Sequence, residues 1–404
     1  MFVSLAKHRN YRLYFAGQFV SQIGTWLQNA AQAWLILDIT HSAQAVGVLG
    51  FFFYGPYAAV GLVGGAVADR FDRRRTLVIT QVAMAVCAAA LAVVTFAHLD
   101  SVWVIDGIAF VRGIVLVFNN PARQALVVQM VGRSELPNAI ALNSSLNNAT
   151  RIVGPAVAGA LIATVGIPIC FALNALSFIP VIAALVAMRE SEFYGQARDR
   201  RGTLLKSIRT GLRYARRSKT IAVVLTMLAI VSLTSINFSV LLPVLARQTM
   251  HGTAATFGYI TAVFGFGALV GALIAASRRR ASRGLLLAAC AGFGALQIVL
   301  APQLGFAWVA VTLFGVGVCY TMYTATTNSL VQLATPFYLQ GRIGGLYSYV
   351  FLASGPLGSL LVGWLAQRSG TWLAFDAGGA AALIMAALGF LTRPWPMPTG
   401  TVRR

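Results

Sequence analysis

The sequence predicts an all-α membrane protein with twelve transmembrane helices in two pseudo-symmetric six-helix bundles. First, 58% of its 404 residues are apolar and only 10% are charged, whereas soluble domains carry about 25% charged residues. Second, apolar runs of roughly 20 residues, enough to cross a hydrocarbon core of about 30 Å, recur along the whole chain. Third, the basic residues cluster between these runs. A water-soluble fold does not fit this composition.

The apolar runs place the twelve spans. We expect them at 13–37, 44–67, 77–97, 102–122, 139–165, 168–188, 220–245, 256–276, 284–302, 307–329, 343–367 and 372–391. The first run follows Lys7, Arg9 and Arg12 and contains several amides, so we interpret it as a retained helix and not as a cleavable signal peptide.

The net charge of +21 could indicate a nucleic-acid partner. Its placement argues otherwise, because all 31 Lys and Arg residues except Arg112, Arg151, Arg247 and Arg368 fall on one predicted side of the membrane. This is the positive-inside pattern. It predicts a bacterial inner-membrane protein with both termini in the cytoplasm, attraction to anionic membrane lipid, and no nucleic-acid partner.

One long connection divides the chain into an N-terminal bundle at 1–188, a linker at 189–219 and a C-terminal bundle at 220–404. The linker holds ten basic residues, and Leu204, Leu205, Ile208 and Leu212 recur in it at helical spacing. We therefore expect a cytoplasmic amphipathic helix lying on the membrane surface.

The two halves repeat one pattern. Gly61 and Gly65 precede Arg73 and Arg74 as Gly267 and Gly271 precede Arg279 and Arg280, at an offset of 206 residues. A second repeated feature is the Gly-Pro dipeptide, which occurs as Gly154-Pro155 in the fifth span and as Gly355-Pro356 in the eleventh. Repeated halves that enclose a central site are common in transporters, although paired glycines can also mean close helix packing alone.

The segment Gly65-Ala-Val-Ala-Asp69-Arg70-Phe-Asp72-Arg73-Arg74-Arg75 resembles the G-x-x-x-D-R-x-G-R-R signature of the major facilitator superfamily. It departs from the pattern at Asp72, where the family usually has glycine. The resemblance implies a conformational latch, in which Asp69 faces arginines and a helix N-terminus. The latch set is Gly65, Asp69, Arg70, Arg73, Arg74 and Arg123. The alternative is a solvated loop whose Asp69 only caps a helix end.

The runs that begin at Asn119 (Asn-Asn-Pro-Ala-Arg123), at Glu135 and at Asn147 resemble the enterobactin-exporter branch of that superfamily, which is grouped with drug:proton antiporters. Gly154, Pro155 and Gly159 form an imperfect antiporter signature, because Thr150 and Ala158 replace glycines. The resemblance implies a proton-coupled exporter of small amphipathic molecules, such as siderophores, acidic metabolites or drugs. A metabolite importer and a non-transporting receptor or scaffold remain alternatives.

Several polar side chains fall inside the spans. On the first helix a stripe within about 80° faces one direction, so it should meet the cavity or another helix. Its members are Gln18, Gln22, Thr25, Asn29 and Gln32. Weaker candidates for the cavity are Asn143, Asn147, Asn237, Tyr320, Tyr323 and Asn328.

Arg112 and Arg151 lie about 15 Å and 18 Å from their helix ends at 1.5 Å per residue, near the midplane. Such cations should pair, line water or meet an anionic substrate. We expect Asp106 to pair with Arg151, and Asp106 or Asp38 to be open to proton coupling. Because no carboxylate lies at midplane, the cavity should be positive and prefer anionic or strongly hydrogen-bonding substrates.

The sequence lacks the residue patterns of an ATP-driven pump, an enzyme or a metal site. No lysine follows the glycine of a P-loop pattern, and no catalytic or metal-spaced set is present. The four cysteines lie singly in different apolar runs, without a Cys-x-x-Cys pair. We therefore expect no enzyme, no cofactor and no metal site. The expected partners are a small-molecule substrate, protons and membrane lipid, and the expected state is a monomer.

Overall fold

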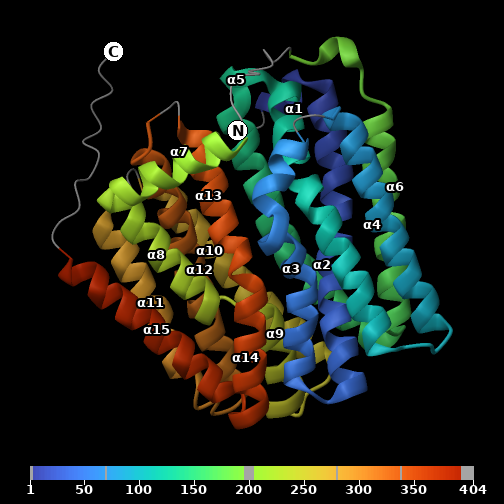
Figure 1. Ribbon diagram of the computed structural model, residues 1–404. Helices are drawn as coiled ribbons and strands as arrows, with labels where there is room; N and C mark the ends of the chain where they lie inside the picture. The colour runs from blue at the N-terminus through green and yellow to red at the C-terminus, as the bar shows by residue number, and fades with distance from the viewer. Residues whose placement is uncertain (1–2, 69–70, 195–203, 279–280, 337–338, 393–404) are drawn as a thin grey trace.

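The computed structural model describes residues 3–68, 71–194, 204–278, 281–336 and 339–392. Secondary structure in these ranges is entirely helical (Figure 1). The first half contains α1 (Val3–Lys7), α2 (Arg9–Thr40), α3 (Ala43–Ala68), α4 (Arg73–Phe96), α5 (Val102–Thr164), α6 (Ile167–Val186) and η1 (Glu190–Glu192). After it come α7 (Leu204–Arg217), α8 (Lys219–Thr234), α9 (Phe238–Val244), η2 (Leu245–Thr249), α10 (Ala254–Ser277), α11 (Arg283–Leu300), α12 (Phe306–Leu333), α13 (Gln340–Ala353), α14 (Gly355–Ser369) and α15 (Thr371–Leu391).

Ten helical stretches in the described part of the chain are long and apolar enough to cross a membrane. The other two expected spans lie in α2 and in the part of α5 beyond Gly132. Their amides lower the mean hydropathy, but α2 has 32 residues and so extends about 48 Å. Hydrogen bonds to neighbouring helices compensate for these amides, as the site shows below.

The expected fourth and fifth spans leave residues 123–138 between them, and in the structure this segment is helical on both sides of Gly132. The chain changes direction only at Gly132, where φ is 69° and ψ is 178°. A side chain would be strained in that conformation, and glycine is not. The fourth and fifth spans are therefore two helices that meet at the kink of Gly132, and the polar and proline residues around it remain helical.

Asp72, which stands where the superfamily signature usually has glycine, is the N-cap residue of α4. It precedes α4, and its Oδ1 accepts a hydrogen bond from the Arg75 backbone N–H at 2.8 Å. An aspartate in this position caps the helix, typically for about 1 kcal/mol. The helix thus begins at Arg73 without the glycine that the family usually has.

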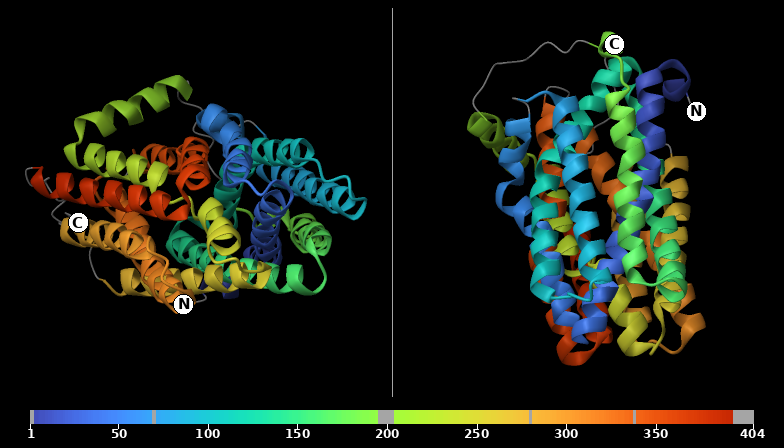
Figure 2. Two further views of the ribbon diagram at one scale, coloured as in Figure 1. Left: turned by 90° about the horizontal axis from the view of Figure 1, so that it is seen from below. Right: turned by 90° about the vertical axis from the view of Figure 1, so that its right-hand side faces the viewer.

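The helices α2 to α6 lie on one side of the molecule and α8 to α15 on the other (Figures 1 and 2). Between the two sides, α5 packs against α10 and α3 packs against α14. A Cβ atom added at Gly159 would lie 2.6 Å from Gly258 Cα, and one at Gly363 would lie 3.0 Å from Gly47 Cα. Glycines thus allow backbones from the two sides to touch.

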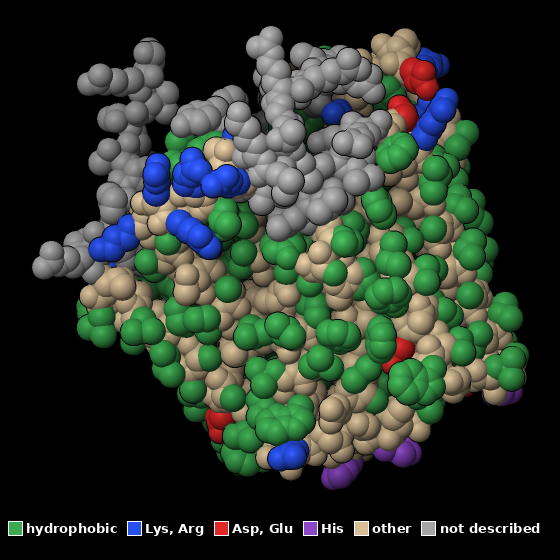
Figure 3. All heavy atoms as spheres, in the orientation of Figure 1, with side chains coloured by type: hydrophobic (Ala, Val, Ile, Leu, Met, Phe, Trp, Pro, Cys, Tyr) green, Lys and Arg blue, Asp and Glu red, His purple; other side chains and the backbone are tan. Residues whose placement is uncertain are grey.

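The two ends of the molecule differ in charge. Basic side chains gather at the end that carries α7, histidines appear at the opposite end, and hydrophobic side chains cover the belt between them (Figure 3). On α7, Arg209, Arg213 and Arg216 are exposed, while Gly211 and Ala215 are buried. We call the end with α7 the basic end and the other the distal end.

The distal end is closed by polar contacts between the two sides. Arg247 Nη2 donates to Asp38 Oδ1 at 2.8 Å, and Gln248 Nε2 donates to the His41 carbonyl at 2.9 Å. The Ala43 N–H donates to Gln367 Oε1 at 2.7 Å. These bonds hold the ends of α2 and α3 to η2 and α14.

Candidate functional site

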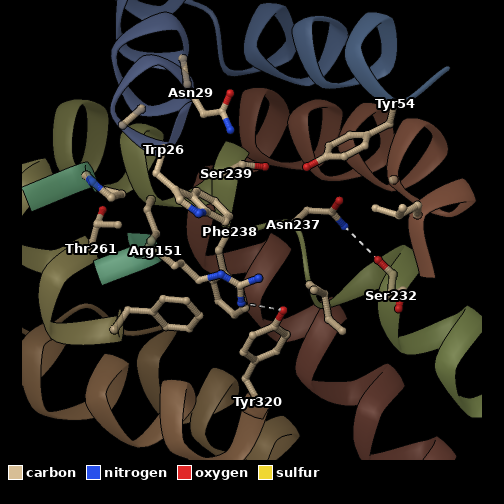
Figure 4. A pocket seen from close by; sticks show the side chains of 18 of the residues that line it. Trp26, Asn29, Tyr54, Arg151, Ser232, Asn237, Phe238, Ser239, Thr261 and Tyr320 are labelled. Carbon is tan, nitrogen blue, oxygen red and sulfur yellow. Dashed lines mark hydrogen bonds between the residues drawn. The ribbon is translucent and has the colours of Figure 1, made fainter. Parts of the chain in front are cut away.

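A cavity of about 190 Å³ lies between the two sides of the molecule (Figure 4). Residues of α2, α3, α5, α8 to α10 and α12 to α14 line it. They are Trp26, Asn29, Ala30, Ala33, Tyr54, Arg151, Pro155, Ser232, Ile236, Asn237, Phe238, Ser239, Leu242, Phe257, Thr261, Phe264, Tyr320, Phe351, Leu352, Ser354 and Gly355.

Arg151 is the cation of this cavity. Its guanidinium lies over the Trp26 ring at 5.1 Å and over the Tyr320 ring at 5.8 Å from the centroids. Its Nη1 donates to the Tyr320 hydroxyl at 3.3 Å (Figure 4). The two rings come from opposite sides of the molecule, so Arg151 links the halves. Its Nε has no hydrogen-bond partner in the described structure.

Aromatic rings form the apolar wall beside Arg151. Phe238 packs on Phe264 at 4.5 Å between centroids and on Tyr320 at 6.0 Å. Trp34 stacks on the cavity residue Phe257 at 5.6 Å with 17° between the planes. Such rings offer flat surfaces to apolar or aromatic parts of a ligand.

The rest of the polar lining is neutral. Amides of Asn29 and Asn237 and hydroxyls of Ser239, Thr261 and Tyr54 lie around the same space (Figure 4). No carboxylate belongs to the described lining. One guanidinium without a counter-charge gives the cavity a positive potential, which attracts acids and disfavours organic cations.

Arg112 is held apart from the cavity. It is 4% exposed, and its Nη1 and Nη2 donate to Gln32 Oε1 at 2.7 Å and to Asn29 Oδ1 at 2.8 Å. Its guanidinium also lies 5.1 Å from the centroid of the Phe53 ring. Amide oxygens and an aromatic face therefore stabilise this charge, and Asn29, one of its acceptors, also lines the cavity.

Most of the polar stripe on α2 bonds to other helices. Gln22 Nε2 donates to Asn147 Oδ1 at 3.1 Å, and Gln32 Nε2 donates to the Ile105 carbonyl at 3.2 Å. Gln18 is buried, and its Oε1 has no partner in the described structure. Of the two interpretations left open by the sequence, interhelical hydrogen bonding fits Gln22 and Gln32, and cavity lining fits Asn29.

The predicted pair of Asp106 and Arg151 is wrong. Asp106 is 1% exposed and neither carboxylate oxygen has a hydrogen-bond partner in the described structure, while Arg151 bonds to Tyr320. Spacing along one helix does not show which neighbouring helix a side chain faces. Asp38 lies at the distal end, 47% exposed, and pairs with Arg247.

Two of the tyrosine and asparagine candidates line the cavity, namely Tyr320 and Asn237. Tyr323 is fully buried, and its hydroxyl has no partner in the described structure. Asn143 accepts from the Tyr11 hydroxyl at 3.4 Å. Asn328 accepts from Gln332 at 3.0 Å.

The latch candidates are only partly visible. Asp69 and Arg70 lie outside the described residues, and Gly65 is described only as part of α3. Arg74 donates to the carbonyls of Leu185 and Val186 at 2.7 and 2.6 Å, at the end of α6. Arg74 therefore caps the C-terminal end of α6, which belongs to the same half of the molecule. Arg123 is half-buried on α5 near Tyr14, and Arg73 is half-buried in the first turn of α4.

The Gly-Pro candidates lie at helix contacts beside the cavity. A Cβ at Gly154 would lie 2.4 Å from Trp26 Cβ. Pro155 and Gly355 line the cavity, and Gly355-Pro356 begins α14 directly after α13 ends. Gly154 therefore permits close packing of α5 against α2, and Gly355-Pro356 follows the break between α13 and α14.

Sequence reasoning missed Trp26 and the phenylalanines of the wall. Aromatic residues are frequent in apolar spans, so their types alone do not distinguish a cavity from a packed core. Trp26 lies three residues before Asn29, a signal of a shared helix face that could have been used.

The arrangement of spans around a central cavity defines the class of the protein as a multi-pass membrane transporter. The chain belongs to the family described as transmembrane secretion effector, MFS_3, whose profile matches residues 3–399. This confirms the resemblance to the major facilitator superfamily, the predicted fold class, and the expectation of a transporter and not an enzyme.

Two curated relatives are similar over most of the chain. Macrolide efflux protein A of Streptococcus pyogenes is 24% identical over 381 residues, which cover 91% of this chain and 92% of that protein. The enterobactin exporter of Shigella flexneri is 26% identical over 394 residues, with 95% and 92% covered.

A solved structure shares the fold. A bacterial homolog of the human lysosomal transporter Spinster, in an inward-facing and unoccupied conformation, matches with a TM-score of 0.72 and 14% identity. The match covers 95% of this chain and 97% of that one.

Proposed function

We propose that the chain is a secondary active exporter that carries small acidic, amphipathic molecules out of a bacterial cell by alternating access. Three observations support this. The chain belongs to a secretion effector family, curated relatives carry the names of efflux proteins, and a cavity with one guanidinium among aromatic rings lies between the two sides.

Arg151 carries the substrate proposal. Its guanidinium is fixed between Trp26 and Tyr320, and no carboxylate of the described lining neutralises it. A carboxylate or phenolate of a substrate would supply the missing negative charge, and its rings or alkyl parts would pack against Phe238 and Phe257. The expected substrate is an acid with an apolar or aromatic body.

Proton coupling rests on Asp106. Ionising a carboxylate buried without a partner costs several kcal/mol, and protonation removes that cost. Asp106 meets this description, whereas Asp38 is half-exposed and paired with Arg247. Asp106 is therefore the better candidate for carrying the proton that drives export.

Under the positive-inside rule, the basic end faces the cytoplasm. Both termini and α7 would then lie on the cytoplasmic side of a bacterial inner membrane. The distal hydrogen bonds would then close the outward path. Reporter fusions after residues 200 and 404 test this orientation, and a periplasmic signal from either would overturn it.

The test of function uses inverted membrane vesicles with an imposed proton gradient. Wild type should accumulate an aromatic acid, and Arg151→Gln should weaken its handling. Losing one charge-assisted hydrogen bond, about 1.5–3 kcal/mol, corresponds to roughly 10- to 100-fold in apparent affinity. Uptake of the neutral amide of the same acid should change little.

Arg368→Gln is the matched control, because Arg368 lies outside the cavity lining, with its guanidinium over Trp364. It should transport as wild type does. Equal handling of acids by Arg151→Gln and wild type would refute the substrate proposal. Accumulation only in right-side-out vesicles would favour an importer, and no flux of any panel member would favour a receptor or scaffold.

A further inference from the structure

The cavity wall formed by α8 and α9 contains a helix interruption inside the membrane. The helix α8 ends at Thr234 and α9 begins at Phe238, so the last carbonyls of α8 lose their helical partners. Asn237 Nδ2 donates to the carbonyls of Leu233 at 3.0 Å and Ser232 at 3.4 Å. Among the described residues, no backbone N–H across the interruption donates to the Thr234 carbonyl.

Two hydroxyl groups add oxygens at the same place. Ser235, which is 0% exposed, donates to the Gly378 carbonyl at 2.7 Å. Thr234 Oγ1 donates to the Ile230 carbonyl at 2.9 Å. The two hydroxyl oxygens lie 3.1 Å apart. Since each hydrogen is already engaged, lone pairs of both oxygens remain for a further partner.

Gln297 of α11 completes the group. It is 0% exposed, and neither its Nε2 nor its Oε1 has a hydrogen-bond partner in the described structure. A Cβ atom added at Gly378 of α15 would lie 2.8 Å from Gln297 Oε1 and 3.0 Å from the Thr234 carbonyl oxygen. These two oxygens therefore face the bare Cα of Gly378, at a place where any side chain would collide with them.

We propose that this interruption binds a monovalent metal cation, with Na⁺ as the fitting ion. The ligands would be the Thr234 carbonyl and hydroxyl, the Ser235 hydroxyl and Gln297 Oε1. Hard cations prefer oxygen ligands, and the C-terminal end of α8 contributes partial negative charge. One water molecule has only two hydrogens for these four oxygens. Broken helices whose carbonyls hold Na⁺ are a known transporter design.

The site adjoins the substrate cavity without belonging to it. Ser232, Ile236 and Asn237 from the interruption line the cavity, whereas Gln297 and Gly378 lie behind this wall. A cation that fixes the end of α8 would therefore also fix the side chains that face the substrate. Patterns of acidic, His and Cys ligands cannot reveal such a site, because its ligands are neutral.

The test measures binding of radioactive ²²Na⁺ to the purified full-length protein, without substrate or gradient, at constant ionic strength in choline chloride. Wild type should bind Na⁺ saturably. Gln297→Leu and Ser235→Ala should each weaken binding about 10-fold or more, the loss expected from one ligand of a charged group. Gln81→Leu should bind as wild type does, since Gln81 is a buried amide of α4.

Absence of saturable binding in wild type would overturn the proposal, and so would unchanged binding in both folded variants. If Gln297→Leu does not fold, Ser235→Ala decides, because it removes only one oxygen. A rise in the wild-type melting temperature with NaCl, but not with choline chloride, is an independent expected result. Because no transport is measured, this outcome is separate from that of the export proposal.

Discussion

Replacing Gln32 by leucine should destabilise the protein by leaving the buried Arg112 guanidinium without one acceptor. The Arg112 Nη1 to Gln32 Oε1 distance is 2.7 Å, and the two residues are 4% and 2% exposed. A hydrogen bond to a charged group contributes about 1.5–3 kcal/mol, so the free energy of unfolding should fall by about 2–3 kcal/mol. Arg112 would keep Asn29 as its second acceptor.

Gln22→Leu is the matched control on the same helix. Gln22 bonds to the neutral amide of Asn147 at 3.1 Å in a part-buried position, for which about 0.5–1.5 kcal/mol is expected. Both variants would be compared by reversible unfolding in mixed micelles. A loss for Gln32→Leu no larger than that for Gln22→Leu would refute the view that α2 amides hold the Arg112 charge.

A double-mutant cycle sharpens this test. In the background of Arg112→Met the charge is gone, so Gln32→Leu should cost much less than in wild type. The coupling between the two changes should be about 2 kcal/mol, in the range seen for contacting residues. Additive losses would show that Gln32 acts independently of Arg112.

The remaining predictions concern transport. Asp69→Asn should insert normally but lose most flux, because it removes the charge of the proposed latch at nearly constant size; normal flux at normal expression would contradict it. Asp106→Asn should abolish proton-driven accumulation while substrate exchange without a gradient persists, and undiminished accumulation would exclude Asp106 as the proton carrier. Gly159→Ala should impair transport, because its Cβ would lie 2.6 Å from the α10 backbone, whereas Gly107→Ala on the same helix meets nothing within 4 Å and should be neutral in the same vesicle assay.

The sequence predicted the features that depend on local composition. Apolar run length placed the spans, and helical spacing predicted a helix over Leu204 to Leu212, which is observed as α7. These properties follow from one helix at a time, so they need no knowledge of its neighbours.

The features that depend on packing between helices escaped prediction. Depth did not show that Arg112 faces amides of α2 while Arg151 faces Trp26 and Tyr320, and this caused the wrong partner for Asp106. The turn at Gly132 required a backbone angle and not an apolar count. Likewise, the interruption after Thr234 lies within one continuous apolar run, so hydropathy alone could not reveal it.

The most direct measurement of the central claim compares three matched compounds in inverted vesicles containing wild-type protein. They share one aromatic body and carry a carboxylate, a neutral amide or an ammonium group. The positive cavity around Arg151 predicts proton-driven accumulation in the order acid, then amide, then cation. Accumulation of the cation above the acid would contradict the account, because no arrangement of the described lining offers it a counter-charge.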